Sequence, residues 1–223
     1  MAFSKVLRAG LIVASLVWVC GVGAGLYLLL RYENSPGEKI AAPTEWPDES
    51  RIPRRAGHAT LVMLAHPHCP CTRASLWELA ELMAHDQGKV DAYVILSHPA
   101  GMPDNWEKTD LWYSAAQIPG VKVLSDPEAA EARRFRAVTS GSTILYNAEG
   151  HLMFEGGITG GRGHAGDNAG QSALIALLNS GKAPVAETPV FGCPIFTPGS
   201  TAVNEACPMK GDAPEQTSAT TEP

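Results

Sequence analysis

The 223-residue chain lacks the features of several protein classes. It has no long basic cluster, and its one short basic group, Arg51, Arg54 and Arg55, is interrupted by Ile52 and Pro53. The formal net charge is -6 and the pI is about 5.6, so we expect no nucleic-acid partner. The sequence also shows no internal repeat and no P-loop spacing of glycines. The chain without its ends has room for one domain with a hydrophobic core.

Charged residues are absent from Ala9 to Leu30. A helix of about 22 residues is roughly 33 Å long, which is enough to cross the hydrocarbon core of a bilayer. Lys5 and Arg8 precede this stretch, so the positive-inside rule places the N-terminus inside the cell. The sequence therefore predicts a cytoplasmic N-terminus at 1–8 and a transmembrane helix at 9–30. The protein is then a single-pass cell-membrane protein whose domain faces the periplasm or the exterior.

A cleaved signal peptide is the alternative for this segment. Tyr27-Leu-Leu-Leu-Arg31 closes the apolar stretch and offers no small-x-small cleavage site. Cys20 follows Val19 and not a small residue, which argues against a lipoprotein cysteine. We therefore favour an uncleaved anchor, in which Cys20 is a small apolar residue of the helix.

Three further segments follow the apolar stretch. Residues 31–57 are rich in Pro, Glu and Ser and are predicted to be a linker that acts as a tether. Residues 58–181 carry the periodic patterns of a folded domain. Residues 182–223 form a Pro- and Thr-rich extension that we expect to be partly disordered. On the exported side, disulfides among these residues would persist.

The domain alternates strand and helix patterns. Thr60–Ala65 and Val90–Leu96 are short apolar runs typical of buried strands, and Arg73–His85 has apolar residues at helical spacing. Alternation predicts parallel strands first, and the final hairpin adds antiparallel ones, which indicates an α/β fold with a mixed sheet. The other predicted elements are a helix at 105–117, a strand at 121–124, a helix from the Ser125-Asp126-Pro127 start signal to about 135, a hairpin of 142–146 and 151–155, and a helix at 171–178.

Two cysteines lie in the turn between the first strand and the first helix, in the motif His66-Pro-His-Cys-Pro-Cys-Thr72. Proline suits the first helical position, so Pro70 predicts Cys69 at the N-cap and Cys71 in the first turn. A sulfur at a helix start receives backbone N–H groups and the favourable end of the dipole, which lowers a thiol pKa. We therefore predict an exposed Cys69 thiolate and redox chemistry at sulfur.

This element order with Cys-Pro-Cys after the first strand resembles the thioredoxin-like superfamily, and in particular membrane-anchored redoxins related to thioredoxin and peroxiredoxin. The resemblance covers roughly Ala59 to Leu178. It implies a thioredoxin-like three-layer sandwich and a thiol–disulfide oxidoreductase that acts on protein or small-molecule thiols and disulfides. The stretches that carry it are Leu61–Arg73, Ile118–Asp126 and Ser140–Tyr146 with its hairpin, while Gly156–Asn168 is a glycine-rich loop of a narrower subgroup.

The sequence departs from that family in two ways. The family motif is Cys-x-x-Cys, whereas here the spacing is Cys-x-Cys. Either Cys69 matches the first family cysteine in a shorter turn, or Cys71 matches the second and His68 replaces the first. Family members also carry a cis-proline before the hairpin strand, where this chain has Gly141-Ser142.

Two cysteines are candidates for the thiol that resolves a mixed disulfide on Cys69. Cys71 can resolve a mixed disulfide on Cys69, although a Cys-x-Cys disulfide closes a small, strained ring and is easily reduced. Cys193 in the extension can act as the resolving thiol instead, or it forms a structural clip with Cys207. His68 is expected to tune the thiolate.

Two other functions use the same residues. A thiol peroxidase would position peroxide with Thr72, Arg73 and Arg162, and Thr72 and Arg162 also serve as positioning residues in the oxidoreductase. We favour no cofactor.

The other alternative is a copper-binding or metal-delivery module, because thiolate and imidazole are ligands that copper prefers. Its ligands would come from Cys69, Cys71, His66, His68 and His164.

Overall fold

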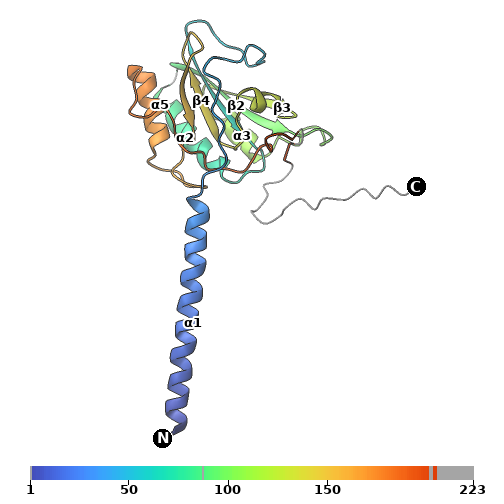
Figure 1. Cartoon of the computed structure of the whole chain (residues 1–223). Helices are drawn as coiled ribbons and strands as arrows, with labels where there is room; N and C mark the ends of the chain where they lie inside the picture. The colour runs from blue at the N-terminus through green and yellow to red at the C-terminus, as the bar shows by residue number, and fades with distance from the viewer. Residues whose placement is uncertain (1, 87, 201–202, 205–223) are drawn as a thin grey trace, which may run out of the picture.

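The computed structural model describes residues 2–86, 88–200 and 203–204. The first element is a long helix, α1 (Ala2–Glu33), which extends away from the folded domain (Figure 1). Within the described residues, its segment Leu7–Glu33 is long and apolar enough to cross a membrane, with a mean hydropathy of 2.1. Its large apolar side chains are exposed, as expected for a helix with no protein neighbours.

A five-stranded mixed sheet forms the centre of the domain, in the order β3-β2-β1-β4-β5. The central strand β1 pairs in parallel with β2 and antiparallel with β4, so the predicted parallel strands and closing hairpin are confirmed. Met63 of β1 lies opposite Val94 of β2 and Thr143 of β4. The strands are β1 (Ala59–Ala65), β2 (Val90–His98), β3 (Val121–Pro127), β4 (Ser142–Tyr146) and β5 (Leu152–Gly156).

Helices cover both faces of this sheet and complete three layers. Three helices, α2 (Thr72–His85), α3 (Asp110–Ala116) and α5 (Ala169–Ser180), share one core with the sheet, in which Met63, Leu79 and Phe154 are fully buried. The short helix α4 (Ala130–Arg134) packs with the opposite core, around Phe135 and Tyr146. The predicted thioredoxin-like three-layer α/β sandwich is therefore confirmed.

Two predicted helix starts differ from the structure. Helix α2 begins at Thr72 with Cys71 as its N-cap, so Cys69 lies two residues before the N-cap and not at it. Helix α3 begins at Asp110 and not at 105, because the Thr109 hydroxyl accepts the N–H of Leu111 and caps the helix there.

Helix α4 begins later than the Ser125-Asp126-Pro127 signal predicted. Strand β3 continues through Pro127, so the proline does not open the helix. Ala129 then adopts a left-handed conformation with φ 52°, and α4 begins at Ala130. The buried Asp126 carboxylate accepts the N–H groups of Glu131 and Ala132 at 2.8 and 2.9 Å, which caps the helix from outside it.

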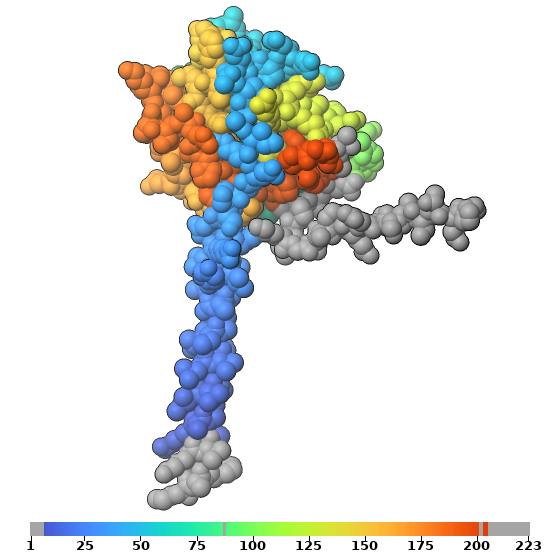
Figure 2. All heavy atoms as spheres, viewed as in Figure 1, coloured from blue at the N-terminus to red at the C-terminus, as the bar shows by residue number. Residues whose placement is uncertain are grey.

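The segment predicted as a tether packs on the domain over much of its length. The Gly37 N–H donates to the Val190 carbonyl at 2.8 Å, and the Trp46 N–H donates to the Gly150 carbonyl at 2.8 Å. The Trp46 ring lies edge-on to Phe135, 5.1 Å between centroids. Figure 2 shows this segment running over the surface of the domain. We call residues 34–57 the strap, because they hold the domain to the end of α1.

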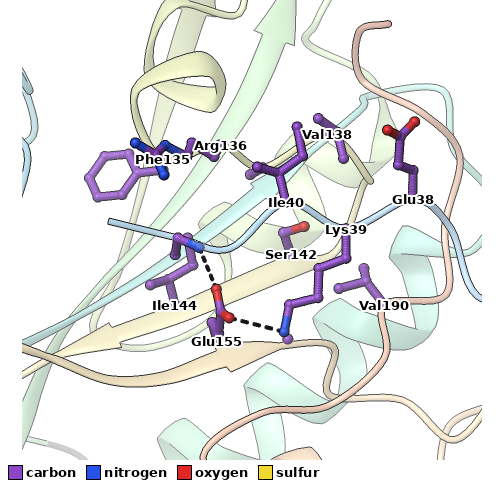
Figure 3. A pocket seen from close by; sticks show the side chains of 13 residues that line it. Glu38, Lys39, Ile40, Phe135, Arg136, Val138, Ser142, Ile144, Glu155 and Val190 are labelled. Atoms are coloured by element: carbon purple, nitrogen blue, oxygen red, sulfur yellow. Dashed lines mark hydrogen bonds and ion pairs between the residues drawn. The ribbon is translucent and has the colours of Figure 1, made fainter. Parts of the chain in front are cut away.

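A pocket lies where the strap crosses the hairpin (Figure 3). Glu155 of β5 occupies it and binds the Lys39 ammonium at 3.1 Å and the Ala42 N–H at 2.5 Å. Because its main polar groups are paired with each other and none of the cysteines lines it, this pocket belongs to the attachment of the strap.

The first part of the C-terminal extension is ordered against the domain. The Glu155 N–H of β5 donates to the Ala186 carbonyl at 3.0 Å, and the Thr188 N–H donates to the Glu155 carbonyl at 3.2 Å. Ile195 and Phe196 are buried in the core beside α4. Residues 201–202 and 205–223, Cys207 among them, lie outside the described residues, so the partial disorder predicted for the extension stays a prediction there.

Candidate redox site

Three cysteines are buried together at the carboxyl end of β1. Cys69, Cys71 and Cys193 are 0%, 8% and 2% exposed and form one cluster. Cys69 and Cys71 are free thiols, whereas Cys193 is disulfide-bonded. The expectation of an exposed Cys69 was wrong, because the C-terminal segment covers it. Cys20 is free and exposed on α1.

Backbone turns fix the position of Cys69. The Cys69 N–H donates to the His66 carbonyl at 3.1 Å, and the Cys69 carbonyl accepts the Thr72 N–H at 3.1 Å. Pro70 has no N–H to place, so the chain turns tightly from strand to helix between these two bonds. Cys71 follows at the N-cap with a helical backbone conformation, φ -66° and ψ -27°.

The Cys69 sulfur is surrounded by hydrogen-bond donors. The Cys71 thiol lowers the pKa of Cys69 most, and the Cys193 N–H and Thr72 add to this against the opposing effect of burial. The result is a Cys69 pKa of about 5. The same hydrogen bond, together with burial and the Cys69 charge, raises the pKa of Cys71 far above its ordinary value. The pair therefore shares one proton, which stays on Cys71.

A chain of hydroxyl groups supports the Thr72 contribution. The Ser140 hydroxyl oxygen accepts the His66 N–H at 2.8 Å and lies 2.8 Å from the Thr72 hydroxyl oxygen. Since Thr72 donates to Cys69, Ser140 is left to donate to Thr72. Sequence reasoning missed Ser140, because it lies far from the motif in the chain.

Arg162 connects the cysteine cluster to the end of α1. Its charge and a hydrogen bond act to lower the pKa of Cys71, against the larger effects of Cys69 and burial. Its guanidinium donates to the Gly192 carbonyl at 2.7 Å and to the Ser35 carbonyl at 3.1 Å, and it lies 5.0 Å from the centroid of the Tyr32 ring. The structure therefore places Arg162 beside Cys71.

The two motif histidines have different environments. His66 is buried, and burial lowers its pKa. Its Nδ1 accepts the His68 N–H at 3.2 Å, which leaves the proton on Nε2 for the Asn204 carbonyl at 2.8 Å. His68 is exposed, and its ring centroid lies 4.4 Å from that of Trp106. The groups that most strongly shift the Cys69 pKa do not include His68.

The copper ligand set is not assembled in the described part of the chain. No three His, Cys, Asp or Glu side chains there are grouped so that they could hold a metal ion. His66 uses both ring nitrogens in backbone contacts, and His164 pairs with Glu33 at 3.4 Å. Of the residues predicted to position peroxide, Thr72 and Arg162 lie beside the cysteines, whereas Arg73 forms a surface ion pair with Asp110.

The loop before β4 takes the place of the family's cis-proline. No cis peptide is present among the described residues, and Gly141 has a φ of 90°. The neighbouring Ser140 N–H donates to the Cys193 carbonyl at 2.8 Å, and Thr139 forms an antiparallel bridge with Pro194. The chain's own extension therefore occupies the backbone position beside Cys69.

The glycine-rich loop is fixed by a buried carboxylate that the sequence did not single out. Glu78 of α2 is fully buried and accepts the Gly166 N–H at 2.6 Å and the Asn168 amide at 3.1 Å. Asn168 in turn caps α5 by accepting the Gln171 N–H. These contacts place the loop that carries Arg162 beside the cysteines.

Fold and site together define a thioredoxin-like domain with a buried Cys-x-Cys dithiol. The sequence matches no protein-family model and no curated protein. Among solved structures, an uncharacterized conserved protein from Geobacillus kaustophilus is similar at 21% identity over 75% of this chain and 92% of its own, with a TM-score of 0.54.

A hypothetical protein from Sinorhizobium meliloti 1021 is similar at 23% identity over 64% of this chain and 82% of its own, with a TM-score of 0.52. A secreted Mycobacterium tuberculosis disulfide oxidoreductase is similar at 15% identity over 56% and 83%, with a TM-score of 0.41. These similarities concern the fold.

Proposed function

We propose that this chain is a membrane-tethered thiol–disulfide oxidoreductase, in which Cys69 attacks and Cys71 resolves. The observation that carries the proposal is the buried cluster that holds the free thiols of Cys69 and Cys71. The hydrogen bond between them lowers the pKa of Cys69 to about 5 and raises that of Cys71, which therefore retains its proton. A thiolate is the nucleophile of disulfide exchange, and a neighbouring thiol two residues away can release the bound substrate.

The reaction follows from these positions. The Cys69 thiolate attacks a substrate disulfide and forms a mixed disulfide, and the substrate's other sulfur leaves as a thiolate. Once the negative charge on Cys69 is used in the new bond, the main cause of the raised Cys71 pKa disappears. Arg162 then favours the Cys71 thiolate, which attacks Cys69, so that the Cys69–Cys71 disulfide forms and the bond from Cys69 to the substrate breaks. The Cys71 proton passes to the departing substrate sulfur, the substrate is reduced by two electrons and the dithiol is oxidised by two. The same steps in reverse oxidise a substrate dithiol.

The tether follows from α1, which has the length and composition of a membrane span. The positive residues before it, Lys5 and Arg8, favour a cytoplasmic N-terminus and an exported domain. In an exported compartment such as the periplasm, substrate disulfides are stable enough to need an enzyme. The substrate class is a protein or small-molecule disulfide.

The test is reduction of a model protein disulfide, or oxidation of its dithiol form, by the full chain in detergent. We expect Cys69→Ser to lower the rate to background, and Cys71→Ser to allow one mixed disulfide without turnover. Cys20→Ser is the matched control, because Cys20 is also free but lies on α1. Full activity of Cys69→Ser, with metal chelated, would refute the proposal.

A further inference from the structure

The C-terminal extension pairs with the loop before β4, beside Cys69, through a short antiparallel bridge. The Ser140 N–H donates to the Cys193 carbonyl at 2.8 Å, and the Ile195 N–H donates to the Val138 carbonyl at 2.7 Å. These bonds give the antiparallel bridge of Thr139 with Pro194. Addition of an extended segment to a strand edge is a common way for a domain to hold a peptide.

The paired segment of the extension places Cys193 next to the Cys69 sulfur. The Cys193 N–H donates to the Cys69 sulfur at 3.4 Å, and Cys193 is 2% exposed within the cluster of three cysteines. The fit is close at the preceding residue, where a Cβ on Gly192 would lie 1.9 Å from the Ser140 carbonyl oxygen. The segment is therefore seated in a fitted position, with a disulfide-bonded cysteine next to a thiolate.

We propose that residues 191–196 are a built-in substrate of the redox site, and that the Cys193 disulfide exchanges electrons with the Cys69–Cys71 dithiol. This inference rests on the proposed function. Cys20, Cys69 and Cys71 are free thiols, whereas Cys193 is disulfide-bonded. The device couples the oxidation state of the dithiol to the attachment of the C-terminal extension.

The exchange balances without an outside reagent. Cys69 attacks the Cys193 sulfur, so the Cys69–Cys193 bond forms, the existing disulfide bond of Cys193 breaks and its other sulfur leaves as a thiolate. Cys71 then attacks Cys69 as its proton passes to the departing Cys193 sulfur. The Cys69–Cys71 dithiol is oxidised by two electrons, and the Cys193 disulfide is reduced by two.

Ring strain decides the resting direction of this exchange. A Cys-x-Cys disulfide closes a small, strained ring and is easily reduced. The reduced dithiol is therefore the resting form, in agreement with the free Cys69 and Cys71 thiols and the disulfide-bonded Cys193 of the structure. An external disulfide that takes electrons from the dithiol competes with the extension for the same sulfur.

The first experiment traps the intermediate in the full chain, with Cys20→Ser as background. Cys71→Ser keeps a hydroxyl donor for Cys69 but cannot resolve. After equilibration in a graded thiol–disulfide buffer, followed by alkylation and peptide mapping, we expect a Cys69–Cys193 linkage, with the former partner of Cys193 alkylated. Cys69→Ser is the control and should keep the original disulfide of Cys193. An intact original Cys193 disulfide with free Cys69 at every buffer potential would overturn the inference.

The second experiment tests whether the close fit of residues 191–196 beside Cys69 covers the thiol. Gly192→Ala should displace this segment, so that alkylation of Cys69 becomes about tenfold faster, equivalent to ~1.4 kcal/mol. Gly160→Ala is the matched control, because nothing lies within 4 Å of its added Cβ. An unchanged rate in Gly192→Ala would overturn the seated-substrate assignment.

Reduction of a model disulfide by the parent chain separates the two proposals. Activity without the Cys69–Cys193 linkage means that the built-in substrate is wrong and the oxidoreductase stands. Absence of both refutes the two together.

Discussion

Cys69 is a buried thiol whose pKa lies below the ordinary value of 9.0, although burial acts in the opposite direction. Hydrogen bonds from Cys71, Cys193 and Thr72 outweigh burial, because each of them favours the charged form of the sulfur. The helix start contributes through the Thr72 N–H and not through an N-cap position for Cys69. The lowered pKa was therefore predicted correctly from the sequence, but its main cause was not.

A pH titration checks this at the residue scale. In the Cys20→Ser chain, we expect a single thiolate with a midpoint near pH 5, measured by ultraviolet thiolate absorbance. Cys69→Ser should remove this transition. Since the folded pKa is depressed, its contribution to stability is present above the unfolded value of 9.0 and is lost as the pH falls through 5. A midpoint above pH 8 would contradict the arrangement of donors.

At the scale of single elements, the spacing of apolar residues was sufficient to predict the strands and helices whose position depends on burial. Strands β1 and β2, the hairpin of β4 and β5, and helix α5 lie within a few residues of their predicted positions. It failed where one side chain decided a helix start, as Thr109 and Asp126 do. Such caps depend on the backbone conformation of the loop, which residue types alone do not specify.

The Asp126 cap gives a prediction for one helix. Asp126→Ala removes the acceptor of two buried N–H groups at the start of α4, so we expect the free energy of unfolding to fall by about 1–2 kcal/mol. Chemical denaturation with an unchanged slope measures the loss. Asp104→Ala on an exposed loop is the control and should change stability by less than about 0.5 kcal/mol. Equal stability of the two variants would refute the cap.

At the scale of the whole molecule, the strap and the extension join parts that are distant in the chain. The strap was predicted as a tether because its composition is polar and rich in proline, yet Ala42 and Ile52 are buried in the core beside α4. The extension contributes Cys193 and the cover of the redox site in the same way. Isolated apolar residues in an aperiodic segment leave no pattern that reveals such packing.

Trp46 provides the test of the strap. Its ring packs against Phe135 and Tyr146, so Trp46→Ala should destabilise the domain by about 2–3 kcal/mol and expose the strap to proteases. Trp77→Ala is the matched control, because the Trp77 side chain is 65% exposed. Thermal unfolding and limited proteolysis measure both effects. A strap cleaved equally fast in the parent chain and in Trp46→Ala would contradict the packing.

Arg162 reaches the backbone just beyond α1 with the same guanidinium that faces Cys71. The side chain of Arg162 thus joins the cysteine cluster directly to the end of α1, with no long flexible linker between them. With α1 in a bilayer, the cysteine cluster would remain close above the lipid headgroups and would move only together with α1. Reaction partners would have to present their disulfides at that height, so geometry would select among them before chemistry does.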